Sequence, residues 1–124
     1  MPTAVVKTSV AEEPSAEVEL IRPLYEQAMS MFRDSVDAFV REDVDLGRAV
    51  VARDEKLDEL NHSASRKLIE RMAQDPEQLR GYLNLIFVGR CLERVGDHAT
   101  NIAEDAVYAA AAEDIRHQTL ATAT

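Results

Sequence analysis

Two short segments of this sequence carry acidic side chains at a spacing that could hold a metal ion. The first runs from Asp54 to Asp58 and reads DEKLD, and the second runs from Glu93 to Asp97 and reads ERVGD. Residues four positions apart lie on the same face of a helix, so each pair could chelate or bridge one cation. Ligands that are all oxygen suit Mg, Ca, Mn or iron better than copper or structural zinc.

A turn between the two segments would bring them to the same height in an antiparallel pair of helices. The clearest boundary is Asp75-Pro76, because Asp is a good N-cap and Pro is tolerated in the first turn. The first acidic pair is centred 19 residues before Asp75, and the second is centred 20 residues after it. At about 1.5 Å per residue the pairs would stand within ~2 Å of each other along the axis. Helical angles place both pairs at the edge of an apolar arc. They leave open whether the two edges face each other or point apart.

Two other interpretations of the acidic pairs stay open. The pairs could form a solvated rim that is neutralised by nearby basic residues, namely Arg53, Lys56, Arg90 and Arg94. They could also belong to a di-metal carboxylate enzyme, which would need a Glu-x-x-His pattern on two helices. Only Glu59 and His62 have that spacing, and Glu59 points away from the acidic edge. No Walker A loop, Gly-rich dinucleotide turn or Ser-His-Asp arrangement is present in the sequence.

Three long helices must position these side chains. Apolar residues recur at helical spacing over about 21–42, 44–74 and 76–112, and no stretch alternates apolar and polar residues as a strand would. The chain has only four Gly and four Pro in 124 residues, which favours a few long elements. Short connections between long helices indicate antiparallel neighbours. We therefore expect an all-α fold, an antiparallel up-down-up three-helix bundle.

The domain is expected to cover residues 17–114, between a flexible N-terminal tail, 1–16, and a C-terminal tail, 115–124, that frays. Each helix has an apolar face that should form the core. On the first helix this face consists of Leu24, Ala28, Met31, Phe32, Ser35, Val36 and Phe39. On the second it consists of Leu46, Val50, Leu57, Leu60, Ala64 and Leu68, and on the third of Leu85, Leu92, Ala99, Ile102, Ala103 and Ala106. Gly96 interrupts the third helix at a cost of about 1 kcal/mol relative to Ala, so a neighbouring helix or a ligand is expected to approach it closely.

Composition limits the classes of partner. The net charge of −9 disfavours nucleic acid and anionic lipid surfaces, and it is compatible with cations and basic proteins. A single cysteine, Cys91, excludes a disulfide within the chain and indicates a reducing compartment. No apolar stretch approaches the ~20 residues that would span a bilayer. We therefore expect a cytoplasmic protein without a membrane span.

The C-terminal half of the sequence resembles the last helix of the PhoU family, the phosphate-uptake regulators. The similarity is carried by LERVGDHATNIAED together with the preceding LRGYLNLIFVGRC. The segment DAFVREDVDLGRAVVARDEKLDEL resembles the earlier helices of the same domain. The resemblance covers about residues 20–110, which is most of the chain.

The resemblance implies a three-helix bundle that binds metal ions on its surface and regulates without catalysing a reaction. It implies that the phosphate-starvation response is restrained through contacts with the ATPase of the phosphate ABC transporter and with the phosphate-sensing histidine kinase. The metal would be divalent or trivalent, such as iron, zinc, Mg or Mn. The ligands that the resemblance implies are Asp54, Asp58, Glu93 and Asp97, with Asn101 and Glu104 as weaker candidates.

The number of domains departs from the family pattern. Typical members carry two such domains in tandem, whereas this chain has one, which looks more like the second. Three explanations stay open: a homodimer that rebuilds the pair, a fragment of a longer protein, or a diverged single-domain relative. The diverged relative could be a helical interaction or dimerisation module that has the fold without the phosphate role.

Overall fold

The computed structural model describes residues 16–123, with side chains from residue 16 to residue 120, and confirms the all-α fold class. The predicted N-terminal tail, 1–16, lies outside the described residues except for Ala16. The described elements are, in chain order, α2 (Ala16–Glu19), α3 (Arg22–Arg41), α4 (Val44–Ala52), α5 (Asp54–Gln74), the short 3-10 helix η1 (Pro76–Gln78) and α6 (Leu79–Ala123). None of the helices within 16–123 is long and apolar enough to cross a membrane.

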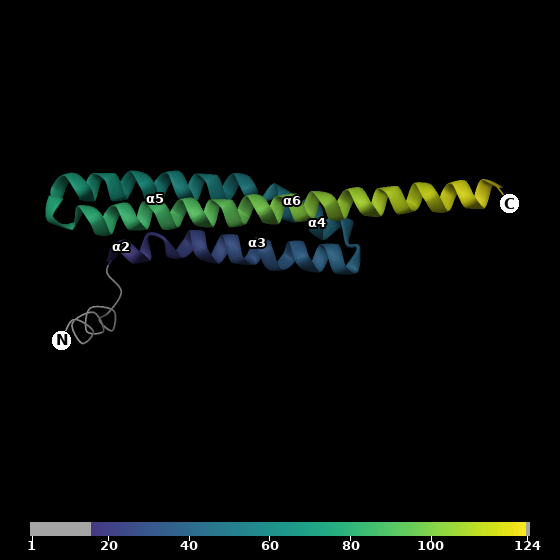
Figure 1. Cartoon of the computed structure of the whole chain (residues 1–124), viewed down its shortest axis with the longest axis horizontal. Coiled ribbons are helices and arrows are strands. Elements are labelled where there is room, and N and C mark those ends of the chain that lie inside the picture. The colour runs from purple at the N-terminus through teal and green to yellow at the C-terminus, as the bar shows by residue number, and fades with distance from the viewer. Residues whose placement is uncertain (1–15, 124) are drawn as a thin grey trace.

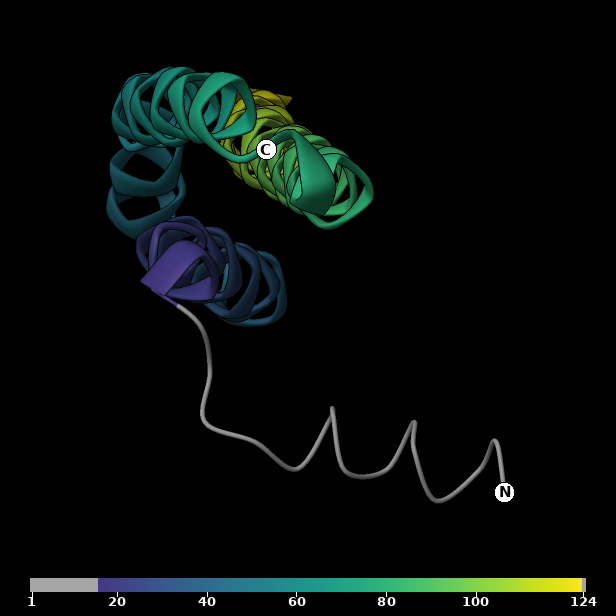
Figure 2. The ribbon, with the colours of Figure 1, turned by 90° about the vertical axis from the view of Figure 1, so that its left-hand side faces the viewer.

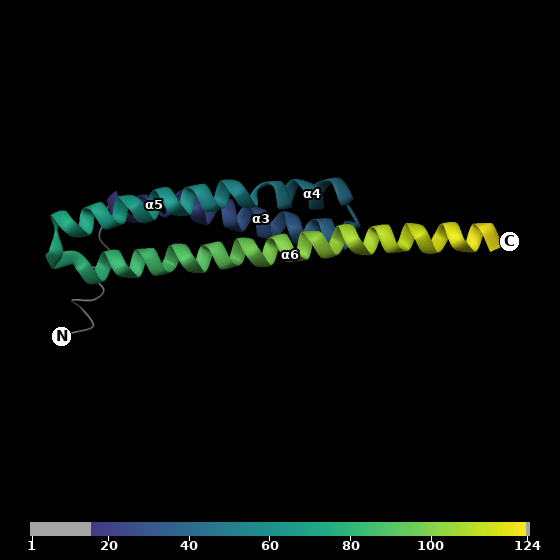
Figure 3. The ribbon, with the colours of Figure 1, turned by 90° about the horizontal axis from the view of Figure 1, so that it is seen from above.

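The long helices α3, α5 and α6 run side by side along one axis (Figures 1 and 3), and α4 is displaced from the line of α5 toward α3 (Figure 2). Viewed along that axis, α3, α5 and α6 occupy three corners of the bundle (Figure 2). α6 packs against α3, α4 and α5 and is therefore the element that all the others share. Its C-terminal part continues past the turn that joins α3 to α4 (Figure 3).

The core lies between the large side chains of the first helices and the small residues of α6. Leu24, Met31, Val50, Leu57 and Leu68 are completely buried. The residues that α6 buries are mostly alanines: Ala99, Ala103 and Ala106, with Tyr82 and Leu92. Small residues on α6 let the neighbouring helices approach its backbone closely.

The predicted core face of α3 includes three residues that the structure leaves exposed. The pattern predicts Phe32, Val36 and Phe39 in the core, but these side chains are 38%, 40% and 52% exposed. The buried stripe of α3 consists only of Leu24, Ala28, Met31, Ser35 and Ala38. The two stripes differ by a single position in the sequence, so they point about 100° apart around the helix.

The second predicted helix is interrupted at Arg53. Arg53 has φ −84° and ψ −8°, and its N–H donates to the carbonyl of Val50 at 3.0 Å, a 3-10 turn between α4 and α5. The Arg53 side chain reaches across to α3, where it donates to Asp34 Oδ2 at 2.6 Å and to Ser30 Oγ at 3.0 Å. The break therefore coincides with a tertiary contact, and it leaves Asp54 as the first residue of α5.

The last helix is longer than predicted. α6 continues to Ala123, whereas the pattern predicts an end near residue 112 and a frayed tail. The segment after Ala106 has no Gly or Pro to stop a helix, and it is rich in Ala, the best helix former. Oε1 of Glu113 also lies 2.6 Å from Nη2 of Arg116 and 3.0 Å from Nε2 of His117. Pairs at these spacings support a helix locally.

Candidate metal centre

Asp58, Glu93 and Asp97 all lie within electrostatic range of Asp54, at the seam between the start of α5 and the middle of α6. Burial raises the pKa of the Asp54 carboxyl above its ordinary value, and the negative charges of Asp58, Asp97 and Glu93 raise it further. Like charges shift a pKa in this way only when they lie close by. The two acidic edges therefore face each other, which is the alternative that helical angles alone leave open.

Among the described side chains, the Asp54 carboxylate has no cationic partner that would stabilise its charge. Its Oδ1 atom is buried without a hydrogen-bond partner, and so is Oγ1 of Thr100. The Thr100 hydroxyl lies near the Asp54 carboxylate and acts to lower its pKa. The two groups do not, however, reach ordinary hydrogen-bond geometry. A buried acceptor without a partner costs about 1–3 kcal/mol. The seam thus contains a buried carboxylate oxygen that has no protein partner in hydrogen-bond geometry.

Basic side chains do not neutralise this cluster. Arg53 is the nearest in sequence, but its guanidinium pairs with Asp34 on α3. Lys56, Arg90 and Arg94 are exposed. Among the residues whose side chains are described, none of the four carboxylates takes part in an ion pair. The structure therefore does not support the interpretation of a rim neutralised by arginine and lysine.

Asn61 of α5 is a further member of the seam, and the acidic-pair pattern does not identify it. Its Nδ2 donates to Glu93 Oε2 at 3.0 Å, while its own Oδ1 is buried without a partner. Gly89 provides the space, because a Cβ at that position would lie 2.9 Å from Asn61 Oδ1. Spacing could have indicated Asn61, since it follows Asp54 by seven positions and Asp58 by three and so shares their face.

Gly96 lies beneath the same seam. A Cβ at Gly96 would overlap Cδ2 of Leu57 and lie 3.9 Å from Cε of Met31. Side chains from α5 and α3 therefore fill the space over this glycine. A neighbouring helix, and not a ligand, explains why the acidic helix carries a glycine here.

The weaker candidates, Asn101 and Glu104, are both exposed. Glu104 is not among the charges that raise the pKa of Asp54. Glu104 instead lines a surface hollow between α4 and α6, together with Arg48 and Tyr108. Four of the six predicted ligands thus lie within electrostatic range of one another, and their role as metal ligands stays a prediction.

The donors of the cluster fit a hard cation, because all of them are oxygens. As the side chains stand, no three Asp, Glu, His or Cys residues in the described part of the chain are grouped closely enough to hold one ion. Asp97 is exposed and Asp58 is half-buried, so both carboxylates have room to turn toward Asp54.

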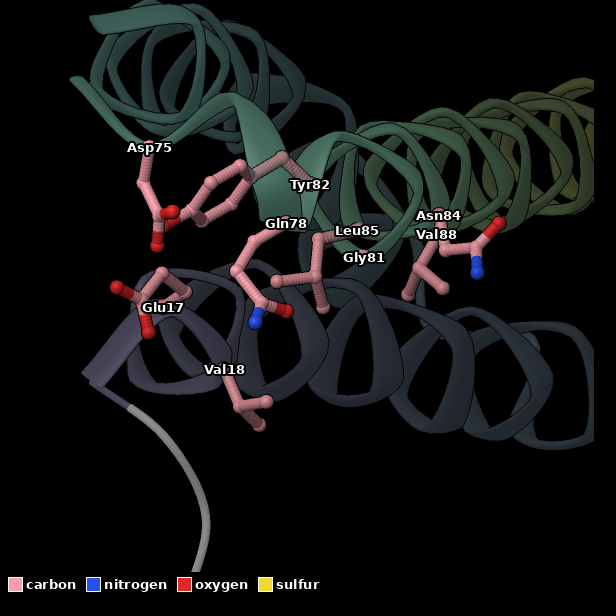
Figure 4. Close-up of a pocket in the computed structure, with 9 residues that line it drawn as sticks. All are labelled: Glu17, Val18, Asp75, Gln78, Gly81, Tyr82, Asn84, Leu85 and Val88. Carbon is pink, nitrogen blue, oxygen red and sulfur yellow. The ribbon is translucent and has the colours of Figure 1, made fainter. Parts of the chain in front are cut away.

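A separate pocket lies at the far end of the bundle, between α2 and the first turns of α6 (Figure 4). Its volume is about 430 Å³. Its lining residues are Glu17, Val18, Asp75, Gln78, Gly81, Tyr82, Asn84, Leu85 and Val88. None of these residues belongs to the acidic cluster, so the pocket is not part of the candidate centre.

Residues 21–106 match the family model described as "PhoU domain". The chain is 39% identical over 109 residues to the phosphate-specific transport system accessory protein PhoU homolog of Pseudomonas putida, covering 88% of this chain and 42% of the relative. It is 40% identical over 106 residues to the Pseudomonas aeruginosa homolog, covering 86% and 43%. The crystal structure of PhoU from Pseudomonas aeruginosa is similar with a TM-score of 0.73 and 39% identity, over 81% of this chain and 47% of that one. The chain thus spans less than half the length of these relatives.

Proposed function

Because this chain belongs to the PhoU family, we propose that it restrains phosphate uptake and phosphate-starvation signalling through protein contacts, without catalysing a reaction. The proposal rests on 39% identity to a solved PhoU over 81% of the chain, with a shared fold. Relatives from two Pseudomonas species are named accessory proteins of a phosphate-specific transport system. An accessory role of this kind requires binding surfaces, and the buried core described above leaves most charged residues available for them.

We infer that the partners are the ATPase of a phosphate ABC transporter and a phosphate-sensing histidine kinase, which places the chain in the cytoplasm. The net charge of −9 favours basic protein surfaces as partners and disfavours nucleic acid. The alternative is a helical module that has kept the fold and lost the phosphate role.

The regulatory proposal is tested by deleting the gene in its own host and measuring phosphate uptake in phosphate-rich medium. We expect uptake to rise in the deletion strain and to return to the original rate when the full chain is expressed again. Purified chain should also bind the purified transporter ATPase in a calorimetric titration. Unchanged uptake together with no ATPase binding would favour the module without a phosphate role.

We propose that the acidic seam binds a divalent or trivalent metal ion through Asp54, Asp58, Glu93 and Asp97. Three observations support this proposal: the buried Oδ1 of Asp54 that has no partner, the electrostatic influence of three further carboxylates on Asp54, and the lack of ion pairs at the seam among the described side chains. When bound, the ion would supply positive charge that neutralises the cluster. Iron, zinc, Mg and Mn are the ions to compare.

Thermal unfolding after chelation and re-addition of each metal tests this site. An ion that binds the folded state at a hundred times its Kd stabilises it by about 2.7 kcal/mol, which raises the Tm. We expect Asp54→Ala and Asp97→Ala to abolish this rise. The matched control is Glu55→Ala, which removes an exposed carboxylate next to Asp54 and should keep the rise. Equal shifts in all of these variants would rule the seam out as the binding site.

We also propose that the chain associates with a second copy of itself. Its relatives are about twice as long, so a homodimer would restore an assembly of their size. The mass of the purified chain in solution tests this association directly.

A further inference from the structure

α3 carries a second apolar stripe that faces away from its own core. The stripe consists of Tyr25, Met29, Phe32, Val36 and Phe39, at successive spacings of four, three, four and three residues. This is the heptad spacing of a coiled-coil seam. Tyr25 is 55% exposed and Phe39 is 52% exposed, so the outer ends of the seam are open to solvent.

The seam lies on the flank of α3 that is remote from α4 and α5. Ser30 and Asp34 mark the opposite flank, because both of them bind Arg53 at the junction of α4 and α5. The face between the two flanks packs into the core through residues such as Leu24 and Met31. The seam is therefore available to another helix without any change in the bundle.

The charges beside the seam match those of a second α3 in the reverse direction. Glu26 and Arg33 directly follow Tyr25 and Phe32, so both occupy position e of the heptad. In an antiparallel pair, position e of one helix faces position e of the other. Glu26 of each copy would therefore lie beside Arg33 of the other copy, which gives two opposite-charge pairs. Both side chains are exposed, and neither forms an ion pair within the described part of the chain.

A parallel pair would not have this match. In a parallel coiled coil, position e faces position g of the partner helix. The g positions of this seam are Ala28 and Ser35, which are uncharged and completely buried in their own bundle. The seam thus favours an antiparallel arrangement.

We propose that two copies of this chain associate through α3, antiparallel, with Met29 of one copy beside Phe32 of the other and Val36 beside Tyr25. The inference rests on the proposed homodimer and is independent of the phosphate role. It identifies the surface, the orientation and the charge pairs of the interface.

Sedimentation equilibrium of the full chain tests the interface with a pair of matched variants. Phe32→Glu places a charge in the centre of the seam and should weaken association by about a hundredfold or more, as expected for a central aromatic contact. Phe87→Glu is the control, because Phe87 is an exposed phenylalanine on α6, 66% exposed, outside the seam. It should leave the dimer constant unchanged. Circular dichroism checks that both variants keep the wild-type helix content.

Charge exchange tests the orientation. Glu26→Arg alone or Arg33→Glu alone converts two attractive pairs into two repulsive ones and should weaken association by about tenfold. The double variant Glu26→Arg/Arg33→Glu should restore wild-type association. A monomeric wild-type chain would overturn both the homodimer and this interface. A dimer that Phe32→Glu and the charge variants do not weaken would overturn the α3 interface and leave the homodimer standing.

Discussion

At the scale of single residues, Gly96 shows how the acidic helix accepts a residue that weakens helices. Leu57 of α5 is completely buried and lies over the Gly96 backbone. The missing side chain lets α5 and α6 approach each other at the height where their carboxylates meet. Glycine at this position is therefore a packing requirement that also brings the two halves of the seam together.

Replacing this glycine tests that role. We expect Gly96→Ala to lower the free energy of unfolding by about 1 kcal/mol, because overpacking costs about 1–3 kcal/mol and the gain in helix propensity offsets only about 1 kcal/mol. Urea unfolding followed by circular dichroism measures the change. The control is Gly81→Ala on the same helix, where a Cβ would meet no atom within 4 Å. That variant should gain up to about 1 kcal/mol, and a similar loss in both variants would contradict the packing argument.

Asp54 should make stability depend on pH in the metal-free protein. Its pKa is raised in the folded state, by burial first and then by its acidic neighbours. A group with a raised pKa favours folding while it is protonated, and this contribution is lost as the pH rises through the folded-state pKa. At neutral pH the charged Asp54 therefore opposes folding.

We accordingly expect Asp54→Asn to raise the Tm of the metal-free protein by a few degrees at neutral pH. The gain should disappear toward about pH 3, where the wild-type carboxyl is protonated in both states. Thermal unfolding at a series of pH values measures this, with Glu55→Gln as the exposed control. A gain that is the same at all pH values would mean that the charge of Asp54 is not its cause.

At the scale of helices, the break at Arg53 decides how Asp54 enters the seam. The Arg53 guanidinium binds Asp34 and Ser30, and Gln27 donates to its carbonyl at 3.3 Å. These contacts hold the junction against α3 while α5 begins on the other side of it. At this turn, two neighbouring residues thus point to different helices: Arg53 binds α3, and Asp54 faces the carboxylates of α6.

Arg53→Ala should lower the free energy of unfolding by about 1–2 kcal/mol, because hydrogen bonds to a charged group are lost and Asp34 loses its partner. Arg53→Lys keeps the charge but not the planar fork, so we expect an intermediate value. Urea unfolding measures both variants. Arg48→Ala on α4 is the control, since Arg48 is exposed and takes part in no ion pair among the described side chains. A loss as large at Arg48 would show that the contacts with α3 are not responsible.

The relative height of the two acidic pairs on α5 and α6 could be predicted from the sequence, whereas the break between α4 and α5 at Arg53 could not. The height of the acidic pairs depends on helix rise and on the position of the turn at Asp75, and both are local properties. The break at Arg53 has no Gly or Pro to mark it, because its cause is a contact with a helix that is distant in sequence. The sequence also could not show which apolar stripe of α3 is exposed, because the exposed stripe and the buried stripe both have helical spacing.

At the scale of the whole molecule, α6 is longer than the bundle that it completes. Its last buried residue is Ala106, and most residues from Ala111 to Leu120 are exposed (Figure 3). The pairs that Glu113 forms there are within its own helix. The projecting part of α6 therefore adds helix without adding to the core.

Removing residues 114–124 should accordingly change the free energy of unfolding by no more than about 0.5 kcal/mol, as for other exposed positions. The mean helix signal in circular dichroism should fall, because a helical segment is lost. A shorter chain that ends before Ala103 is the control, since it removes two buried alanines, Ala103 and Ala106, and should not fold cooperatively. A large loss of stability from the first truncation would show that the projecting part has contacts that support the bundle.

The dependence of α3 on α6 has a consequence for folding during synthesis. Leu24 lies over Gly89, which follows it by 65 positions in the chain, and Met31 lies over Gly96, also 65 positions later. The nascent α3 therefore leaves the ribosome with its buried stripe uncovered, and the α6 residues that cover it are made 65 positions later. The α5–α6 hairpin, closed by its short turn, has more local contacts and should form before α3 docks. Although α3 is synthesised before the hairpin, we expect it to dock last, with its buried stripe exposed to chaperones during that interval.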